Sequence, residues 1–212
     1  MSTEKPDWLK PHGQAWRVNT SQEVHDNPWF SVEIDDAIAP TGVPAKYFVQ
    51  RYKNVAVGVL PLHDDGRVSL VGQWRHPFNA YSWELPEGGA PHDEDPLDGA
   101  KRELAEEAGL TARDWRQVLT MQLSNASSDE ISIGYLAMGL GPTETDFDPT
   151  EALTPATVPF REALNAAISG QIQDSITVAM LLRVHHMAYE GQLPDRLADA
   201  ILGRGTTGQG GG

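Results

Sequence analysis

Apolar and polar residues alternate along the segment that begins at Trp29. Phe30, Val32 and Ile34 are apolar and the residues between them are polar, a period of two that predicts a half-buried β-strand. The turn sequence PTGVP follows, and KYFVQRY after it predicts a partner strand. Residues 1–27 are polar without a regular period, so we expect an irregular segment there.

Two longer apolar runs, NVAVGVLPL and RVSLVGQW, flank the turn sequence HDDG and predict a β-hairpin. The first run is almost continuously apolar, which is typical of a strand covered on both faces. Further strands are predicted at QVLTMQL and ISIGYLAMGL, and the polar loop SNASSDE separates them.

Three helices are predicted from their caps and their amphipathic spacing. The first is DPLDGAKRELAEEAG, with Asp95 as N-cap, Pro96 at the first helical position and Gly109 as the stop. The sequences PFREALNAAISG and DSITVAMLLRVHHMAYEG predict two more, and Asp174 caps the second of these. Strands mixed with few helices indicate a layered α/β protein with a mixed sheet.

The chain of 212 residues has a net charge of -14 and contains no cysteine. The absence of cysteine excludes disulfides, thiolate metal sites and cysteine nucleophiles. The negative charge argues against binding to nucleic acid, although bound metal ions can allow an acidic protein to bind phosphates. No apolar run approaches the ~18 residues of a membrane span, and the N-terminus shows no secretory signal. We therefore expect a cytoplasmic enzyme with no nucleic-acid or membrane partner.

Three glutamates, Glu103, Glu106 and Glu107, fall within five positions of the first predicted helix. Like charges at this spacing destabilise a helix by a few tenths of a kcal/mol per pair. At 100° per residue, Glu103 and Glu107 lie about 40° apart, beside an apolar stripe. A carboxylate cluster of this kind suits a magnesium ion, which is held by one or two carboxylates and substrate phosphates. A solvated helix face is the alternative.

The spacing of residues around these glutamates decides between the two readings. The residues of the pattern, in order, are Gly88, Glu94, Arg102, Glu103, Leu104, Glu106, Glu107, Gly109 and Leu110. This pattern would arise by chance with a probability on the order of 10^-9 per starting point, given average residue usage. It resembles the Nudix box and matches that signature at every position.

The Nudix resemblance implies an α/β/α sandwich with a mixed sheet, here with a small N-terminal antiparallel β subdomain. We expect this subdomain over residues 1–53, a Nudix domain over 54–203, and a disordered glycine-rich tail over 204–212. The resemblance also implies a site for Mg²⁺, with Mn²⁺ as a substitute. Its ligands are expected to be Glu103, Glu106 and Glu107 with the backbone carbonyl of Glu87. Arg102 is expected to orient the glutamates, and Glu94 to support them.

The segment GQWRHPFNAYSWELPEGG is similar to the QYR…ELPAG segment of ADP-ribose pyrophosphatases and related nucleoside-diphosphate-sugar hydrolases. This similarity implies hydrolysis of the diphosphate bond of ADP-ribose or a related sugar nucleotide. The products are a nucleoside monophosphate and a sugar phosphate. Arg75 is then expected to contact the diphosphate, because guanidinium offers a bidentate fork to phosphate. Glu84 is a substrate-contacting or supporting carboxylate, and Trp29 could stack on the base or pack in the core.

Hydrolysis also needs a group that takes a proton from the attacking water. The loop Ser124 to Glu130 falls where this family places a mobile catalytic loop with a glutamate. Glu130 is the candidate base, and Asp129 is its substitute. Many ADP-ribose enzymes carry Pro-Gly in this loop, whereas this chain has Asn125-Ala126, so the substrate stays open.

Other readings remain. Within enzymes these are a hydrolase of nucleoside triphosphates or dinucleoside polyphosphates, and an isoprenoid isomerase, which usually relies on a cysteine that this chain lacks. Of a different class are Nudix domains that sense nucleotides without catalysis, but those typically have eroded boxes.

Residues 28–53 are too short to bury a core alone, so their apolar alternation needs a partner surface. In the ADP-ribose pyrophosphatase group the matching segment crosses to a second subunit. We therefore expect a homodimer in which Trp29 lies near the partner's substrate, the alternative being a monomer whose strands fold back on their own domain.

Overall fold

The computed structural model describes residues 5–145 and 152–204. These residues form two compact units, one within Met1–Lys53 and Ser124–Asp129, the other within Asn54–Leu123 and Glu130–Gly212. We refer to them as the N-terminal unit and the catalytic unit. Apart from Arg204, the predicted glycine-rich tail lies outside the described residues. In the described part of the chain, no helix has the length and apolarity needed to cross a membrane.

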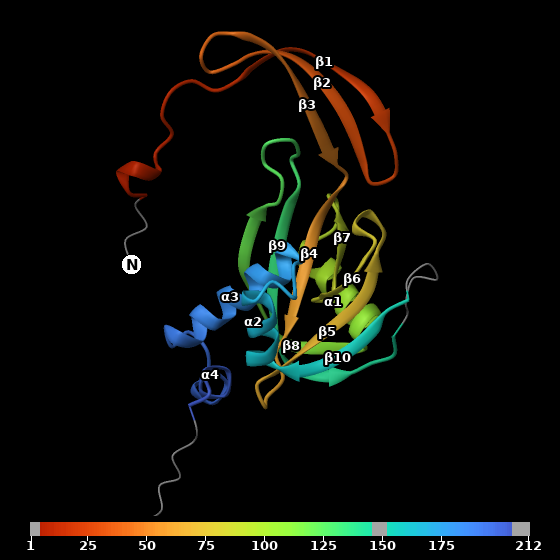
Figure 1. The fold of residues 1–212 in the computed structure, drawn as a ribbon, viewed down its shortest axis with the longest axis vertical. Coiled ribbons are helices and arrows are strands. Elements are labelled where there is room, and N and C mark those ends of the chain that lie inside the picture. The colour runs from red at the N-terminus through yellow and green to blue at the C-terminus, as the bar shows by residue number, and fades with distance from the viewer. Residues whose placement is uncertain (1–4, 146–151, 205–212) are drawn as a thin grey trace, which may run out of the picture. The chain divides into compact units, whose positions relative to one another are not determined.

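The N-terminal unit is an antiparallel sheet in the order β1-β2-β3, preceded by the short 3-10 helix η1 (Figure 1). The elements are η1 (Asp7–Leu9), β1 (Arg17–Asp26), β2 (Phe30–Ile38) and β3 (Pro44–Tyr52). The predicted pair, β2 and β3, is confirmed. The expectation of an irregular segment was wrong for β1, because all ten of its residues are exposed and no alternation marks it in the sequence.

The burial of β2 is the reverse of what its alternation predicts. Ser31 and Asp35 on the polar face are buried, whereas Val32 and Ile34 on the apolar face are only half-buried. The polar face is covered because its neighbours on β3 bind the segment 124–129. Tyr47 donates a hydrogen bond to the carbonyl of Ala126 at 2.5 Å, for example. The apolar face of this sheet is left partly uncovered.

The catalytic unit contains two sheets, with the orders β7-β4-β9-β8 and β10-β5-β6. Strands β4 and β9 pair in parallel and the other pairs are antiparallel, so the first sheet is mixed. The predicted hairpin of β4 and β5 was wrong: the strands enter different sheets, and a single isolated bridge, Leu62 to Val68, joins their ends. The strands are β4 (Asn54–Pro61), β5 (Arg67–Arg75), β6 (Ala80–Glu84), β7 (Glu87–Pro91), β8 (Leu110–Gln122), β9 (Ile131–Pro142) and β10 (Thr154–Pro159), with the 3-10 helix η2 (His76–Phe78).

Helices cover both faces of the mixed sheet, which confirms the α/β/α sandwich (Figure 1). On one face, Val57 and Val59 of β4 pack with Leu104 of α1. On the other, Leu60 belongs to a larger core formed with the remaining helices. This explains the continuous apolar run of β4. The helices are α1 (Pro96–Ala108), α2 (Phe160–Ile168), α3 (Ser175–Tyr189) and α4 (Asp195–Leu202), of which α4 was not predicted.

Candidate active site

Helix α1 begins and ends as its sequence predicts. The Asp95 side chain accepts a hydrogen bond from the Leu97 backbone at 2.9 Å, and Gly109 ends the helix in a left-handed conformation with φ 62°. This frame buries Glu103 and Glu107 and leaves the Glu106 side chain 37% exposed. The three glutamates are therefore not equivalent: two face the sheet and one faces the surface.

Strand β7 meets the two buried glutamates. A Cβ at Gly88 would lie 2.3 Å from the carboxylate of Glu103, so only glycine leaves space for that side chain in this position. The backbone N–H of Glu87 donates to Glu107 at 2.8 Å. Strand β7 therefore fixes both carboxylates through its backbone, which explains why the box begins at a glycine.

Arg102 holds the rest of the box together. Its guanidinium donates to Glu103 at 2.7 Å and to the Gly89 carbonyl at 3.0 Å. It also pairs with Glu106 at 3.5 Å and Glu94 at 3.6 Å. Partial burial works to lower the pKa of Arg102, but the surrounding carboxylates, led by Glu103, hold it above its usual value. Arg102 is placed to orient Glu103.

Arg75, at the end of β5, is bound to two carboxylates. Its Nε donates to both oxygens of Glu84 at 2.9 and 3.0 Å, and its Nη2 donates to Glu87 at 3.1 Å. The hydrogen bonds that Arg75 donates to Glu84 are the main reason that the pKa of Arg75 is raised. Gln73 also donates to the buried Glu84, at 3.3 Å. The Arg75 guanidinium, which the sequence predicts to contact a diphosphate, is here hydrogen-bonded to Glu84.

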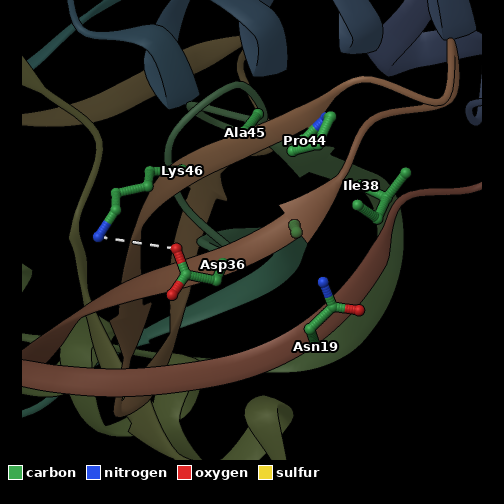
Figure 2. Close-up of a pocket in the computed structure, with 7 residues that line it drawn as sticks. Asn19, Asp36, Ile38, Pro44, Ala45 and Lys46 are labelled. Atoms are coloured by element: carbon green, nitrogen blue, oxygen red, sulfur yellow. Dashed lines mark ion pairs between the residues drawn. The ribbon is translucent and has the colours of Figure 1, made fainter.

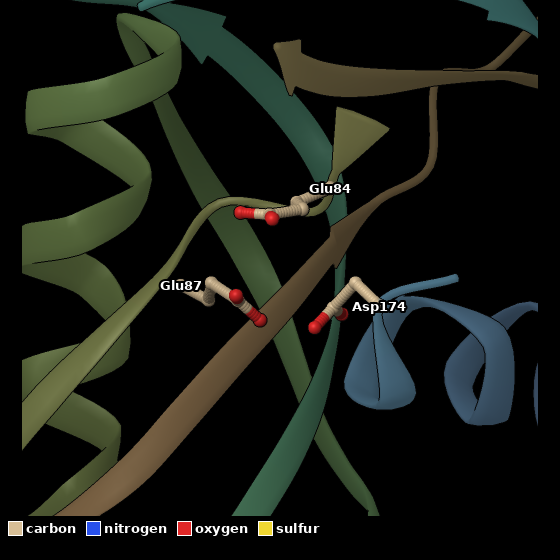
Figure 3. A group of neighbouring side chains, drawn as sticks. All are labelled: Glu84, Glu87 and Asp174. Carbon is tan, nitrogen blue, oxygen red and sulfur yellow. The ribbon is translucent and has the colours of Figure 1, made fainter. Parts of the chain in front are cut away.

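The tightest acidic group is not the one that the sequence predicts. Among the described residues, Glu84, Glu87 and Asp174 each offer an oxygen within 4.8 Å of the other two (Figure 3). Burial, followed by the charges of Asp174 and Glu84, raises the pKa of Glu87 well above its usual value. The sequence predicts Asp174 only as the N-cap of a helix. No residue pattern around Asp174 indicates that it lies close to Glu84.

The two candidate bases belong to different units. Asp129 lies in the N-terminal unit, where it accepts from the Tyr52 backbone at 2.9 Å and pairs with Arg51 at 3.5 Å. Glu130 is the first residue after that segment and lies in the catalytic unit. Burial raises the pKa of Glu130. Trp29, in the N-terminal unit, is 66% exposed and therefore does not pack in a core.

A hollow of about 290 Å³ lies in the N-terminal unit (Figure 2). It is bordered by the ends of all three strands, and the ion pair between Lys46 and Asp36, 3.6 Å apart, spans part of its wall. None of its lining residues is a predicted site residue. They are Asn19, Asp36, Ala37, Ile38, Pro44, Ala45 and Lys46.

Residues 52–177 match the NUDIX domain, which is more than half of the chain. The chain belongs to the Nudix family. Residues 16–50 of this Nudix protein match the nucleoside diphosphate sugar hydrolase N-terminal domain. The box glutamates and the N-terminal sheet therefore both fall in segments that match known domains, and the predicted family is confirmed.

Two relatives place this Nudix chain among hydrolases, and one solved structure shares its fold. It is 32% identical over 175 residues to the ADP-ribose pyrophosphatase of Mycobacterium tuberculosis, covering 78% of this chain and 81% of that protein. It is also 32% identical over 185 residues to the CMP-5'-(N-acetyl-N-hydroxy-3-aminopropyl)phosphonate hydrolase of Streptomyces rubellomurinus, covering 84% and 86%. The crystal structure of an ADP compounds hydrolase shares the fold, with a TM-score of 0.76 at 20% identity over 87% of this chain and 100% of that one. The protein is a Nudix pyrophosphohydrolase.

The box residues fit the divalent metal that Nudix hydrolases generally use. Glu103 and Glu107 supply oxygen donors, which hard cations such as magnesium and manganese prefer. The space against Gly88, which a Cβ would fill, keeps the Glu103 carboxylate close to the backbone of β7. Glu103 and Glu107 are therefore chemically suited to hold a divalent cation.

Proposed function

We propose that this protein hydrolyses the diphosphate bond of ADP-ribose or a related nucleoside diphosphate sugar, giving a nucleoside monophosphate and a sugar phosphate. The observation that carries the proposal is the buried pair Glu103 and Glu107, fixed by Arg102 and by the backbone of β7. The names of the relatives in Mycobacterium tuberculosis and Streptomyces rubellomurinus support a substrate in which a nucleoside monophosphate is joined to a second phosphorus-bearing group.

The proposed cofactor is Mg²⁺, with Mn²⁺ as a substitute. Glu103 and Glu107 are its main proposed ligands, Glu106 is a further one, and the backbone carbonyl of Glu87 completes the protein donors. When bound, the ion neutralises charge on the phosphate oxygens and so stabilises the transferring phosphoryl group. Arg102 orients Glu103, because it donates to that carboxylate from 2.7 Å.

Glu130 is the proposed base. In its ionised form it takes a proton from the attacking water, whose oxygen forms a bond to one phosphorus as the bond to the bridging oxygen breaks. The raised pKa of Glu130 suits this role, because a base whose pKa lies nearer the working pH accepts a proton more readily. Arg75 is the proposed diphosphate contact, and Glu84 holds the orientation of its guanidinium.

A substrate panel tests the proposal. The enzyme is incubated with Mg²⁺ and ADP-ribose, ADP-glucose, GDP-mannose, diadenosine polyphosphates or deoxynucleoside triphosphates, and the phosphorylated products are identified. We expect AMP and ribose 5-phosphate from ADP-ribose, and the corresponding monophosphate pairs from other sugar nucleotides. Turnover of triphosphates alone contradicts the proposal.

The proposed assembly is a two-fold symmetric homodimer formed through the N-terminal sheet, with Trp29 near the partner's substrate. Phe48 pairs with Ile34 on the apolar face of that sheet and is 60% exposed, so this face has apolar surface available for a partner. Two-fold dimers are the commonest closed assemblies. Light scattering coupled to size exclusion should give twice the chain mass of 23.2 kDa. A stable species of the single-chain mass at micromolar concentration contradicts the dimer.

A further inference from the structure

Glu84, Glu87 and Asp174 are brought together by buried packing between the start of α3 and the segment that joins β6 to β7. The Leu85 backbone donates to the buried hydroxyl of Thr177 at 2.8 Å. Gly58 of β4 allows the close approach, since a Cβ there would lie 2.5 Å from Ile176. The three carboxylates are therefore held by the core of the catalytic unit and do not meet by chance at a flexible surface.

One oxygen in this group has no hydrogen-bond partner. The Glu87 side chain is 12% exposed, and its Oε2 atom is buried and unpaired in the described part of the chain. Figure 3 shows the carboxylates of Glu87 and Asp174 pointing toward one another. A buried carboxylate oxygen that is left without a partner is unfavourable, because it has lost its hydration. A bound cation would give this oxygen a partner.

The charge of the group indicates what that partner is. Three carboxylates and the single guanidinium of Arg75 leave a formal charge of -2 when all are ionised. Asp174 uses one oxygen to accept from the Thr177 backbone at 2.7 Å as the cap of α3. A carboxylate so used can still ligate through its other oxygen. One divalent cation balances the charge and gives the unpaired Glu87 oxygen a ligand.

We propose that Glu84, Glu87 and Asp174 bind a divalent cation, in addition to the ion proposed at Glu103 and Glu107. All the donors are carboxylate oxygens, so the site selects a hard ion such as Mg²⁺ or Mn²⁺. An ion there neutralises Glu84 and Glu87, and thereby releases donors of Arg75 for an anionic substrate. The site goes beyond the proposed function, because it can be occupied without substrate and is measured without turnover.

Mn²⁺ binding to the metal-free protein tests this site, with free Mn²⁺ measured by electron paramagnetic resonance. The Glu103→Gln/Glu107→Gln variant removes the main carboxylates of the box and should still bind about one Mn²⁺ per chain. Adding Glu87→Gln or Asp174→Asn to that variant should abolish this binding or weaken it more than about tenfold. In the otherwise unchanged protein, each of the two substitutions should lower the number of bound ions by one.

Asp95→Asn is the matched control. Asp95 and Asp174 are both helix N-caps, and asparagine caps a helix about as well as aspartate. Circular dichroism verifies folding of each variant. Mn²⁺ binding that survives Asp95→Asn but not Asp174→Asn supports the site. Absence of bound Mn²⁺ in the Glu103→Gln/Glu107→Gln variant overturns it, as does binding that is indifferent to both Glu87→Gln and Asp174→Asn.

Discussion

The catalytic unit contains two acidic groups, each with one arginine, and they are built in different ways. In the box, Glu103 and Glu107 come from one helix and are fixed by the adjacent backbone of β7. In the second group, Glu84, Glu87 and Asp174 come from segments far apart in the sequence and share Arg75. The box carboxylates have protein donors that hold them, whereas the second group retains a buried oxygen with none among the described residues.

Because the two groups are built differently, the loss of each should change a different property of the protein. The box presents two fixed carboxylates, so its loss should affect the chemical step. The second group carries a net negative charge around one guanidinium, so its loss should affect ion binding and stability. Variants that distinguish these effects test the comparison.

The largest effect is expected for Glu107→Gln. Glutamine preserves the shape and can still accept from the Glu87 backbone, but it removes one charge from the proposed metal site. Turnover should fall about 10³-fold with an unchanged melting temperature. Asp98→Asn, at an exposed carboxylate on the same helix, serves as control and should leave turnover nearly unchanged. Near-normal turnover of Glu107→Gln at saturating Mg²⁺ contradicts the role of the box.

Glu130→Gln should lower kcat about 10²-fold and change KM little, because a base acts in the chemical step. The pH profile gives a second readout. Burial raises the pKa of Glu130, so the base is protonated over a wider acidic range and kcat rises as pH increases through that raised value. The variant should lack this rise. An unchanged kcat would show that Glu130 is not the base, and Asp129 or a glutamate of the box would then be the candidate.

Gly88→Ala should reduce kcat/KM about tenfold with little loss of stability. The new Cβ would lie 2.3 Å from the Glu103 carboxylate. Because that carboxylate is the end of a long side chain, it can move away at a low cost in stability. The move would displace it from its position in the box. Gly89→Ala is the neighbouring control, because its Cβ would meet the Asn54 side chain and no box glutamate. Equal kinetic losses in both variants, measured at matched folding, would show that Gly88 has no special relation to Glu103.

The last prediction concerns stability and the role of Arg75 in the metal-free protein. Arg75→Gln leaves the buried Glu84 without its charged partner and should lower the free energy of unfolding by about 1–3 kcal/mol. Arg75→Lys should recover part of this loss, because it keeps the charge but not the fork. Lys101→Gln breaks an exposed pair and should cost less than about 1 kcal/mol. If urea unfolding shows a larger loss of stability for Lys101→Gln than for Arg75→Gln, the role of Arg75 as the charged partner of Glu84 is contradicted.

The sequence predicted most reliably what is built from neighbouring residues. The limits of α1, its caps and the orientation of its glutamates follow from 3.6-residue periodicity and local hydrogen bonds. The partners of Asp174 could not be predicted, because they depend on how α3 packs against β4 through Gly58. Strand β1 was missed for a related reason: it pairs with β2 but buries no side chain, so its sequence carries no periodic signal.

The pairing of β4, unlike that of β2 with β3, was also beyond the sequence. A turn signal between β4 and β5 predicts a hairpin, but β4 pairs with β9 and β7. The buried face of β2 was predicted wrongly because the segment 124–129, distant in sequence, binds its polar side. In each case a long-range contact overrides a local pattern.

The most direct test of the central claim follows ADP-ribose by phosphorus nuclear magnetic resonance in the presence of the enzyme and Mg²⁺. We expect the diphosphate signals to be replaced by two monophosphate signals of equal area. The conversion should stop when EDTA is added and resume when excess Mg²⁺ is restored. Diphosphate signals that persist with Mg²⁺, or a conversion that continues in EDTA, would contradict metal-dependent hydrolysis at the box glutamates.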